Sequence, residues 1–195
     1  MGEGGAHATL LRGLGLDTRP AALLARYLDL VAAWNPRINL TGARTPEERV
    51  GVLVAPVWPA ATGLEPGLLL DLGSGNGSPG LVLAALRPDV PVTLLEPRQK
   101  RWAFLREGAR TIGRPEVDVR RCRHDAYDGP PGRTVSVRAL ALPLAELAPL
   151  VAPGGRLLVW GPAPDGESEA FAVEEAPGPG IHARRRQPVD VSRRT

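Results

Sequence analysis

The segment that decides the fold is LLLDLGSGNGSPG, residues 68–80, in which a run of leucines meets an acid and passes into a glycine-rich stretch. Short apolar runs of this kind are typical of buried strands. Pro79 then opens an apolar segment, residues 79–87, that is typical of a helix. A strand, a glycine-rich loop and a helix in this order predict a loop that holds a ligand against bare backbone.

Strands and helices alternate from residue 67 to residue 160. The predicted strands are residues 67–72, 90–96, 116–122, 134–140 and 155–160, and the predicted helices between them are residues 79–87, 97–113 and 142–152. Continuous apolar strands that alternate with helices indicate a parallel sheet buried on both faces. The predicted fold class is therefore α/β, with a mostly parallel, Rossmann-like sheet flanked by helices.

Residues 18–62 predict a helical extension before this core. In residues 18–34 the apolar side chains fall on one helical face, Thr18 is the expected cap, and Asn35-Pro36 is expected to end the helix. A second helix is expected after Thr45, because a proline and two glutamates follow in its first turn.

The last part of the chain, residues 161–195, predicts a short and partly irregular tail with two weak strands at 170–175 and 181–186. No internal repeat or linker divides the sequence. We therefore expect residues 1–195 to form a single domain, with residues 67–160 as its ligand-binding core.

Composition narrows the class of protein. The chain has 195 residues, a net charge of +3 and an isoelectric point of about 9.7, which suits a nucleic-acid partner, although a GC-rich genome would also give an arginine-rich chain. Cys122 is the only cysteine, so an internal disulfide is excluded and no metal is expected. With no apolar run near the roughly 20 residues of a membrane helix and no secretory signal, we expect a cytoplasmic protein without a membrane partner.

The glycine loop by itself fits two classes of ligand. Gly75, Gly77 and Gly80 match G-x-G-x-x-G, which would suit a dinucleotide such as NAD. Asp71 at the mouth of the strand disfavours a pyrophosphate, because like charges repel, and favours the ammonium group of S-adenosylmethionine (SAM). Glu96, at the end of the next strand, suits the ribose hydroxyls of either ligand. The residues that favour SAM are thus Asp71, Gly73, Gly75, Gly77 and Glu96, and a glycine turn without a ligand is the alternative.

A third part of the site is expected after the third strand of the core. Asp125 lies where a carboxylate would accept from the adenine amino group, and His124 beside it would offer its backbone and ring edge. The alternative is a solvated loop. No second histidine and no cysteine stand at metal-ligand spacing from His124, which argues against a metal.

Four segments together resemble the RsmG (GidB) family of bacterial small-subunit rRNA guanine-N7 methyltransferases. They are YLDLVAAWNPRINLTG at 27–42, the stretch 69–107 around the glycine loop, VRALALPLAEL at 137–147 and PGGRLLVWGP at 153–162. The W-N-x-x-I-N-L-T segment is the most specific of them, because other class I methyltransferases lack it. The resemblance implies a class I SAM-dependent fold and methylation of N7 of a guanine in 16S ribosomal RNA, with ribosomal RNA or the small subunit as partner.

The resemblance also implies which residues hold the cofactor. These are the loop residues Gly73 and Ser78, the ribose acid Glu96, the adenine-side pair His124 and Asp125, and Arg138 after the fourth strand. The sequence departs from the family at Ser78, where a large apolar residue is usual, and at Trp160-Gly161, where the family has lysine and glycine. The second helix also lacks the family's polar segment, and the helix between the fifth and sixth strands has little room.

The chemistry implied by the resemblance needs no general base. Guanine N7 has a free lone pair and no proton to lose, so the protein has only to align the nucleophile, methyl group and sulfur and to exclude water. Arg138 is then the candidate for positioning either the cofactor carboxylate or a substrate phosphate; the alternative is a structural ion pair with Asp71. No residue is predicted to be catalytic in the sense of moving a proton.

Aromatic and basic residues give further candidates for RNA contacts, each with an ordinary structural alternative. Trp58, Trp102 and Trp160 would stack a flipped base or belong to the core, and Arg120, Arg121, Arg123 and Arg184–Arg186 would contact phosphates or be solvated. Three other functions stay open: a SAM-dependent small-molecule methyltransferase, a non-catalytic SAM-binding relative, and, more remotely, a nicotinamide enzyme.

Overall fold

The computed structural model describes residues 3–164 and 169–187. Its helices are α1 (Glu3–Gly13), α2 (Thr18–Ile38), α3 (Pro46–Leu53), η1 (Trp58–Ala61), α4 (Gly80–Leu86), α5 (Gln99–Thr111), η2 (His124–Ala126), α6 (Leu144–Leu147) and η3 (Ala148–Leu150). Its strands are β1 (Leu69–Leu72), β2 (Val92–Leu95), β3 (Asp118–Arg120), β4 (Gly132–Arg138), β5 (Val151–Trp160), β6 (Phe171–Glu174) and β7 (Ile181–Arg186).

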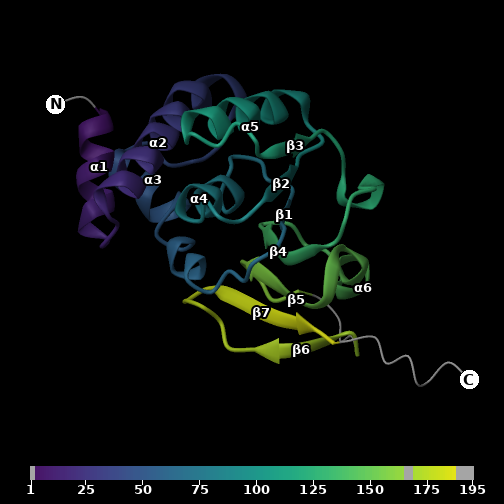
Figure 1. The fold of residues 1–195 in the computed structure, drawn as a ribbon. Helices are drawn as coiled ribbons and strands as arrows, with labels where there is room; N and C mark the ends of the chain where they lie inside the picture. The colour runs from purple at the N-terminus through teal and green to yellow at the C-terminus, as the bar shows by residue number, and fades with distance from the viewer. Residues whose placement is uncertain (1–2, 165–168, 188–195) are drawn as a thin grey trace, which may run out of the picture.

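The strands form one sheet in the order β3-β2-β1-β4-β5-β7-β6 (Figure 1). The first five strands of the chain pair in parallel, while β7 runs antiparallel to β5 and β6 antiparallel to β7. The chain order reverses direction between β1 and β4, so the carboxyl ends of these two strands flank the point where ligands bind in open α/β sheets. The predicted α/β class and mostly parallel sheet are confirmed.

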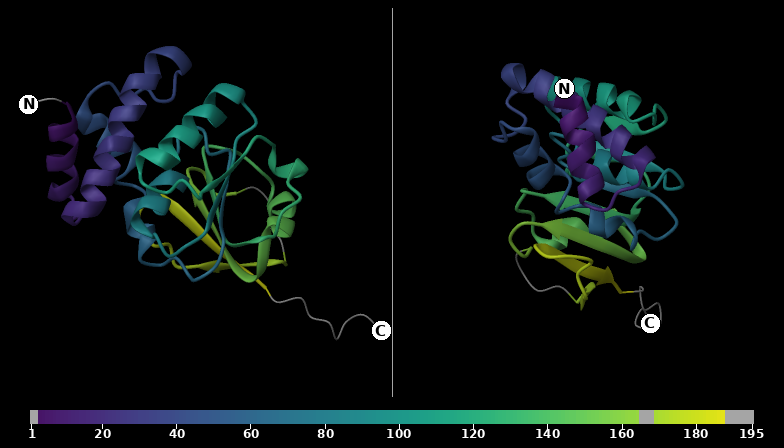
Figure 2. Two further views of the ribbon diagram at one scale, coloured as in Figure 1. Left: turned by 45° about the horizontal axis from the view of Figure 1, so that its top comes forward. Right: turned by 90° about the vertical axis from the view of Figure 1, so that its left-hand side faces the viewer.

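Apolar side chains from alternate strand positions build a core on each face of the sheet. On one face, Leu69 of β1 packs with Leu81 of α4 and Phe104 of α5, together with buried residues of α1, α2 and α3. On the other face, Leu70 and the other buried strand residues pack with Leu147 and its neighbours in α6. Figure 2 shows α1 on the far side of α2, away from the sheet. The N-terminal helices therefore enlarge one core.

Two local predictions for the N-terminal helices were wrong and one was confirmed. Helix α2 does not stop at Asn35-Pro36 but continues to Ile38, because the carbonyl of Asn35 accepts from the N–H of Asn39 at 3.0 Å and so closes the last turn in spite of the donor that Pro36 lacks. Asp17, not Thr18, occupies the cap position, and its side chain makes no capping bond. Thr45 caps α3 as expected, in a reciprocal capping box with Glu48.

The second half of the core also differs from the sequence prediction at one helix. The helix expected over 142–152 shrinks to the single turn of α6 followed by η3, because β5 already begins at Val151 and runs for 10 residues. The two weak strands of the tail are present as β6 and β7. Among the described residues, no helix combines the length and apolarity needed to cross a bilayer.

Candidate functional site: a cavity at the carboxyl ends of β1, β2 and β4

A cavity of about 550 Å³ opens where β1, β2 and β4 end, a size typical of cofactor sites. Its wall includes six of the residues predicted from the sequence: Gly73, Gly75, Ser78, Glu96, His124 and Arg138. Three other predicted residues do not line the cavity: Gly77 and Asp125 lie next to wall residues in the chain, and Asp71 lies two residues before Gly73. The tertiary structure thus brings together residues that are up to 65 positions apart, from Gly73 to Arg138.

The glycine loop needs glycine for its backbone conformation. Gly75 has φ +49° and Gly77 has φ +90°, both in the left-handed region that side chains disfavour. A Cβ on Gly77 would also lie 2.6 Å from Cδ1 of Leu81, which is too close for any side chain. Gly77 therefore serves the packing of the loop against α4, while Gly75 exposes bare backbone to the cavity.

Glu96 ties this loop to the end of β2. Its Oε2 accepts a hydrogen bond from the backbone N–H of Gly75 at 3.1 Å, and its Oε1 accepts from the backbone N–H of Arg98 at 2.8 Å. The side chain is buried yet still lines the cavity. Its carboxylate is held in one orientation, with lone pairs left for a donor in the cavity.

Asp71 lies beneath the loop and not on the cavity wall. Its side chain is fully buried, and Oδ1 accepts a hydrogen bond of 2.5 Å from the Ser136 hydroxyl on the neighbouring strand β4. A Cβ on Gly80 would lie 2.6 Å from Oδ2, so the carboxyl fits under the start of α4 only because residue 80 is glycine. Burial raises the pKa of Asp71 to about 6. This placement therefore does not favour the predicted direct contact between Asp71 and the ammonium group of the cofactor.

Arg138 closes the opposite side of the cavity by contacts with the N-terminal extension. Its guanidinium donates to the Ser78 hydroxyl and to the carbonyl of Val52, both at 2.6 Å. Ser78 in turn donates to the carbonyl of Leu53 at 2.6 Å. No ion pair joins Arg138 to Asp71 in the described part of the chain, so the alternative of a structural salt bridge was wrong. Burial lowers the pKa of Arg138.

The adenine-side pair separates in the structure. His124 lines the cavity and its Nε2 lies 3.0 Å from Oε2 of Glu146 on α6. Asp125 is exposed and pairs with Arg123, with the arginine Nε 3.2 Å from its carboxylate oxygens. Asp125 is thus available to a ligand only if that ion pair opens or is shared.

The comparisons with known proteins agree with this geometry. Residues 21–163 match the family model for rRNA small subunit methyltransferase G. The chain belongs to this family. Among its relatives, ribosomal RNA small subunit methyltransferase G of Leptothrix cholodnii is 36% identical over 189 residues, covering 87% of this chain and 85% of that protein. The Halorhodospira halophila protein of the same name is 40% identical over 147 residues, covering 73% and 70%.

Solved structures confirm the fold of this family member at lower similarity. TrmN from Thermus thermophilus superposes with a TM-score of 0.52 and 21% identity, covering 80% of this chain and 53% of that chain. Coclaurine N-methyltransferase, solved with N-methylheliamine and S-adenosylhomocysteine, gives a TM-score of 0.51 and 17% identity over 68% and 42%. The predictions of family, fold and SAM-dependent methyltransferase activity are confirmed.

The residues of the cavity fit SAM, the cofactor of this family. The wall combines bare loop backbone at Gly75, a fixed carboxylate at Glu96 for hydroxyl donors, and a guanidinium at Arg138 for a carboxylate. Leu40 and Leu142 add apolar surface suited to a purine ring. In the described residues no group of three or more histidine, cysteine or acidic side chains is placed to hold a metal ion.

The tryptophans of this family member serve structure. Nε1 of Trp160 donates to the carbonyl of Pro56, and Nε1 of Trp102 donates to the carbonyl of Val119, both at 2.8 Å. Trp58 packs against the larger core. None of the three lines the cavity; the structure favours the core role for Trp58 and Trp160, whereas Trp102 is half-buried outside both cores.

Most of the arginines considered for RNA binding have partners within the chain. Arg120 pairs with Asp118 and Asp128, and Arg185 pairs with Glu65 and Glu174. Arg184 and Arg186 donate to the backbone carbonyls of Ala183 and Val151. The contacts of these two arginine clusters therefore stabilise β3 and the β6–β7 hairpin. Arg121 is exposed, and in the described part of the chain it makes no ion pair or side-chain hydrogen bond of this kind.

Several wall residues were missed by the sequence reasoning. Leu40 lies in the turn that follows α2, and Asn76 lies in the middle of the glycine loop. Arg98 and Arg101 lie at the start of α5. The W-N-x-x-I-N-L-T segment was the available signal for Leu40, since it marked the family without a role in the predicted site. Arg98 and Arg101 follow Glu96 closely, so their position after the strand end was a second signal.

Proposed function

We propose that this protein transfers the methyl group of SAM to N7 of a guanine in 16S ribosomal RNA. Bound SAM supplies a methyl group activated by the sulfonium. The observation that carries the acceptor atom is that the side chains on the wall that would serve as a base are either engaged by other groups of the chain or held protonated. Glu96 is fixed by two backbone N–H groups, and His124 is paired with Glu146. Burial raises the pKa of Cys122, which keeps its thiol protonated.

This arrangement suits an acceptor that has a lone pair and no proton to lose. The chain's task is then to hold the two reactants in line and to exclude water, which accounts for much of the rate of such a displacement. The segment after β4 reads Ala139-Leu140-Ala141-Leu142 and offers no polar group of the kind that methylation of an exocyclic amine needs. Guanine N7 satisfies both conditions.

The proposed roles of the wall residues follow their positions. Glu96 accepts from the ribose hydroxyls, His124 with Asp125 lies on the adenine side, and Arg138 binds the methionine carboxylate. The loop residues Gly73, Gly75 and Ser78 approach the methionine part with their backbone. Asp71 and Gly77 act one layer below, by holding the loop and α4 in place.

Basic residues at the start of α5 support an RNA substrate. Arg98 and Lys100 are exposed, and Arg98 and Arg101 line the cavity. The first turn of α5 contains no acid, although the helix dipole makes cations unfavourable at this end. An anionic ligand at the cavity mouth would repay that cost, and RNA phosphates are such a ligand. A ribosomal substrate also implies a cytoplasmic location.

The test is a methyl-transfer assay on small ribosomal subunits and on free 16S RNA with labelled SAM. We expect incorporation of one methyl group, and we expect borohydride reduction followed by aniline to cleave the RNA at one guanine, because N7-methylguanine is labile to that treatment. Transfer to an RNA position that resists the cleavage would contradict the N7 assignment. Binding of S-adenosylhomocysteine without any methyl transfer would favour the alternative of a non-catalytic SAM-binding relative. Methyl transfer to small molecules but not to RNA would favour the alternative of a small-molecule methyltransferase.

A further inference from the structure

The buried side chain of Asn35 organises the turn that follows α2. Its Oδ1 accepts from the backbone N–H groups of Leu40 at 2.7 Å and Thr41 at 2.9 Å, while its Nδ2 donates to the carbonyl of Thr41 at 2.9 Å. Asn39 between them has φ +47°, a left-handed conformation that asparagine tolerates better than most residues. One amide therefore fixes residues 40 and 41 by three hydrogen bonds.

This turn contacts the cofactor loop directly. Nδ2 of Asn76, in the middle of the loop, donates to the carbonyl of Leu40 at 3.2 Å. The Oδ1 of the same side chain accepts from the backbone N–H of Ser78 at 3.1 Å. Asn76 thus joins the turn to the far end of the loop, and the side chain of Leu40 becomes part of the cavity wall.

Two further hydrogen bonds hold the turn after α2 and the glycine loop, one from α2 and one from α5. The hydroxyl of Tyr27, a fully buried residue of α2, donates to the backbone carbonyl of Asn76 at 2.8 Å. Nη2 of Arg101 on α5 donates to the carbonyl of Asn39 at 3.2 Å. The loop is therefore connected to α2 by two routes, one through the turn and one through Tyr27.

We propose that Asn35 and Tyr27 are positioning residues for SAM, which hold the glycine loop in its binding conformation without touching the reacting atoms. The inference rests on the proposed use of this cavity for SAM and assigns a task to the N-terminal extension. A loop with glycines at 73, 75 and 77 loses much conformational entropy when it orders. Contacts that order it before the ligand arrives lower the cost of binding and raise affinity.

The chemistry explains why residue 35 is an asparagine. The site needs an acceptor for two N–H groups and a donor for one carbonyl, and a primary amide supplies both. Aspartate would leave the carbonyl of Thr41 without its donor and would add a buried charge next to it. Alanine would release all three bonds and free the turn, while the apolar contacts of α2 would stay.

The experiment compares four proteins: wild type, Asn35→Ala, Tyr27→Phe and Val31→Ala. Val31 is a fully buried residue of the same helix whose side chain belongs to the larger core, so its variant loses stability without touching the turn or the loop. Binding of S-adenosylhomocysteine is measured by calorimetry well below each melting temperature. For the same proteins, KM for SAM and kcat are measured on ribosomal RNA.

We expect Asn35→Ala to weaken S-adenosylhomocysteine binding roughly tenfold and Tyr27→Phe, which removes one oxygen atom, about threefold. We expect the KM for SAM to rise in parallel, with kcat at saturating SAM within about twofold of wild type. Val31→Ala should lower the melting temperature and leave the affinity unchanged. If Asn35→Ala fails to fold, the Tyr27→Phe comparison decides the question.

Unchanged affinity in the Asn35 and Tyr27 variants would overturn the inference, and so would equal weakening by Val31→Ala, because binding would then follow global stability. The proposed function fails in a different way. If wild type binds S-adenosylhomocysteine but methylates no RNA, the substrate assignment is wrong and the calorimetric comparison still stands. If wild type binds neither SAM nor S-adenosylhomocysteine, both proposals fall.

Discussion

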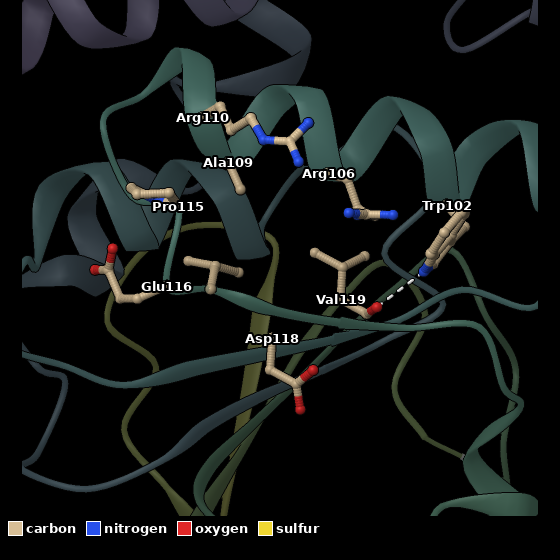
Figure 3. Close-up of a pocket in the computed structure, with 9 residues that line it drawn as sticks. Trp102, Arg106, Ala109, Arg110, Pro115, Glu116, Asp118 and Val119 are labelled. Atoms are coloured by element: carbon tan, nitrogen blue, oxygen red, sulfur yellow. Dashed lines mark hydrogen bonds between the residues drawn. The ribbon is translucent and has the colours of Figure 1, made fainter.

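Two hollows on this protein have similar size and very different construction. The cavity at the strand ends measures about 550 Å³, and a cleft between α5 and β3 measures about 420 Å³. Figure 3 shows the cleft, with Arg106 and Arg110 projecting from α5 above the side chains of Glu116 and Asp118. The guanidinium of Arg106 lies 4.8 Å from the ring centre of Trp102. Both hollows therefore contain arginines and acids.

The difference lies in what the polar groups face. In the cleft, Glu116 pairs with Arg114 and Asp118 with Arg120, so the acids are satisfied by neighbours two residues away. In the cavity, Glu96 and Arg138 come from different strands and hold backbone groups of the glycine loop and the N-terminal extension. The volume of a hollow alone does not indicate a binding site. Polar groups that converge from several elements onto exposed backbone do indicate one.

The largest expected effect is at the loop itself. Gly77→Ala adds a Cβ 2.6 Å from Leu81 at φ +90°, so backbone strain and overpacking add up. We expect a loss of about 4 kcal/mol in the free energy of unfolding and loss of S-adenosylhomocysteine binding, measured by denaturation and calorimetry. Gly113→Ala, also at positive φ but with open space around its Cβ, is the matched control and should keep binding. Equal losses of stability and of binding in the two variants would show that backbone strain alone, and not the contact with Leu81, causes the effect.

The next effect depends on pH. Asp71 has its pKa raised from 3.8 to about 6 by burial, so between these values the folded protein keeps a proton that the unfolded chain loses. Its contribution to stability is therefore full below about pH 4 and is lost as pH rises through 6, by up to about 3 kcal/mol. Asp71→Asn should remove this loss, so the stability of the variant relative to wild type should rise between pH 4.5 and 7 in denaturant titrations.

Glu116 in the cleft provides the opposite case. Arg114 lowers the pKa of this exposed carboxyl, so its contribution is present at neutral pH and is lost as pH falls through the lowered value. The Glu116→Gln difference should therefore move in the other direction, and only slightly because the Glu116 carboxylate is exposed to solvent. Parallel pH profiles for wild type and Asp71→Asn would contradict the raised pKa.

A third comparison removes the cation that closes the cavity. Arg138→Ala should weaken S-adenosylhomocysteine binding roughly thirtyfold, the effect of about 2 kcal/mol from lost charge-assisted hydrogen bonds. Arg138→Lys keeps the charge but cannot reach Ser78 and Val52 with two donors, so it should recover only part of the affinity. Full recovery by lysine in calorimetry would show that charge alone matters.

The smallest effect is expected in the cleft. Arg106→Ala removes the contact with Trp102 but no ion pair in the described part of the chain. We expect stability within about 0.5 kcal/mol of wild type and cofactor affinity within twofold. A tenfold loss of S-adenosylhomocysteine affinity would place the cofactor nearer α5 and β3 than the cavity geometry does.

The parts of the site that were predictable lie close together in the sequence. The strand, the glycine loop and the helix from residue 68 to 87 are encoded by local patterns, and Glu96 by its place at the next strand end. The C-terminal helix over 142–152 was predicted too long, since its apolar residues serve α6 and β5 equally well. The helix stop at Asn35-Pro36 was wrong because Asn35 binds the backbone of the residues that follow the helix, which holds the last turn in spite of the proline.

The sequence by itself determined the α/β class, the ligand loop and the family, because periodicity, glycine conformations and strand ends depend on neighbours a few residues away. Only the tertiary structure decided that Asp71 lies under α4, that Arg138 bonds to Ser78, and that Asn35 reaches the loop through Leu40. Such pairs join residues from different elements, and which partners meet follows from how the helices pack on the sheet.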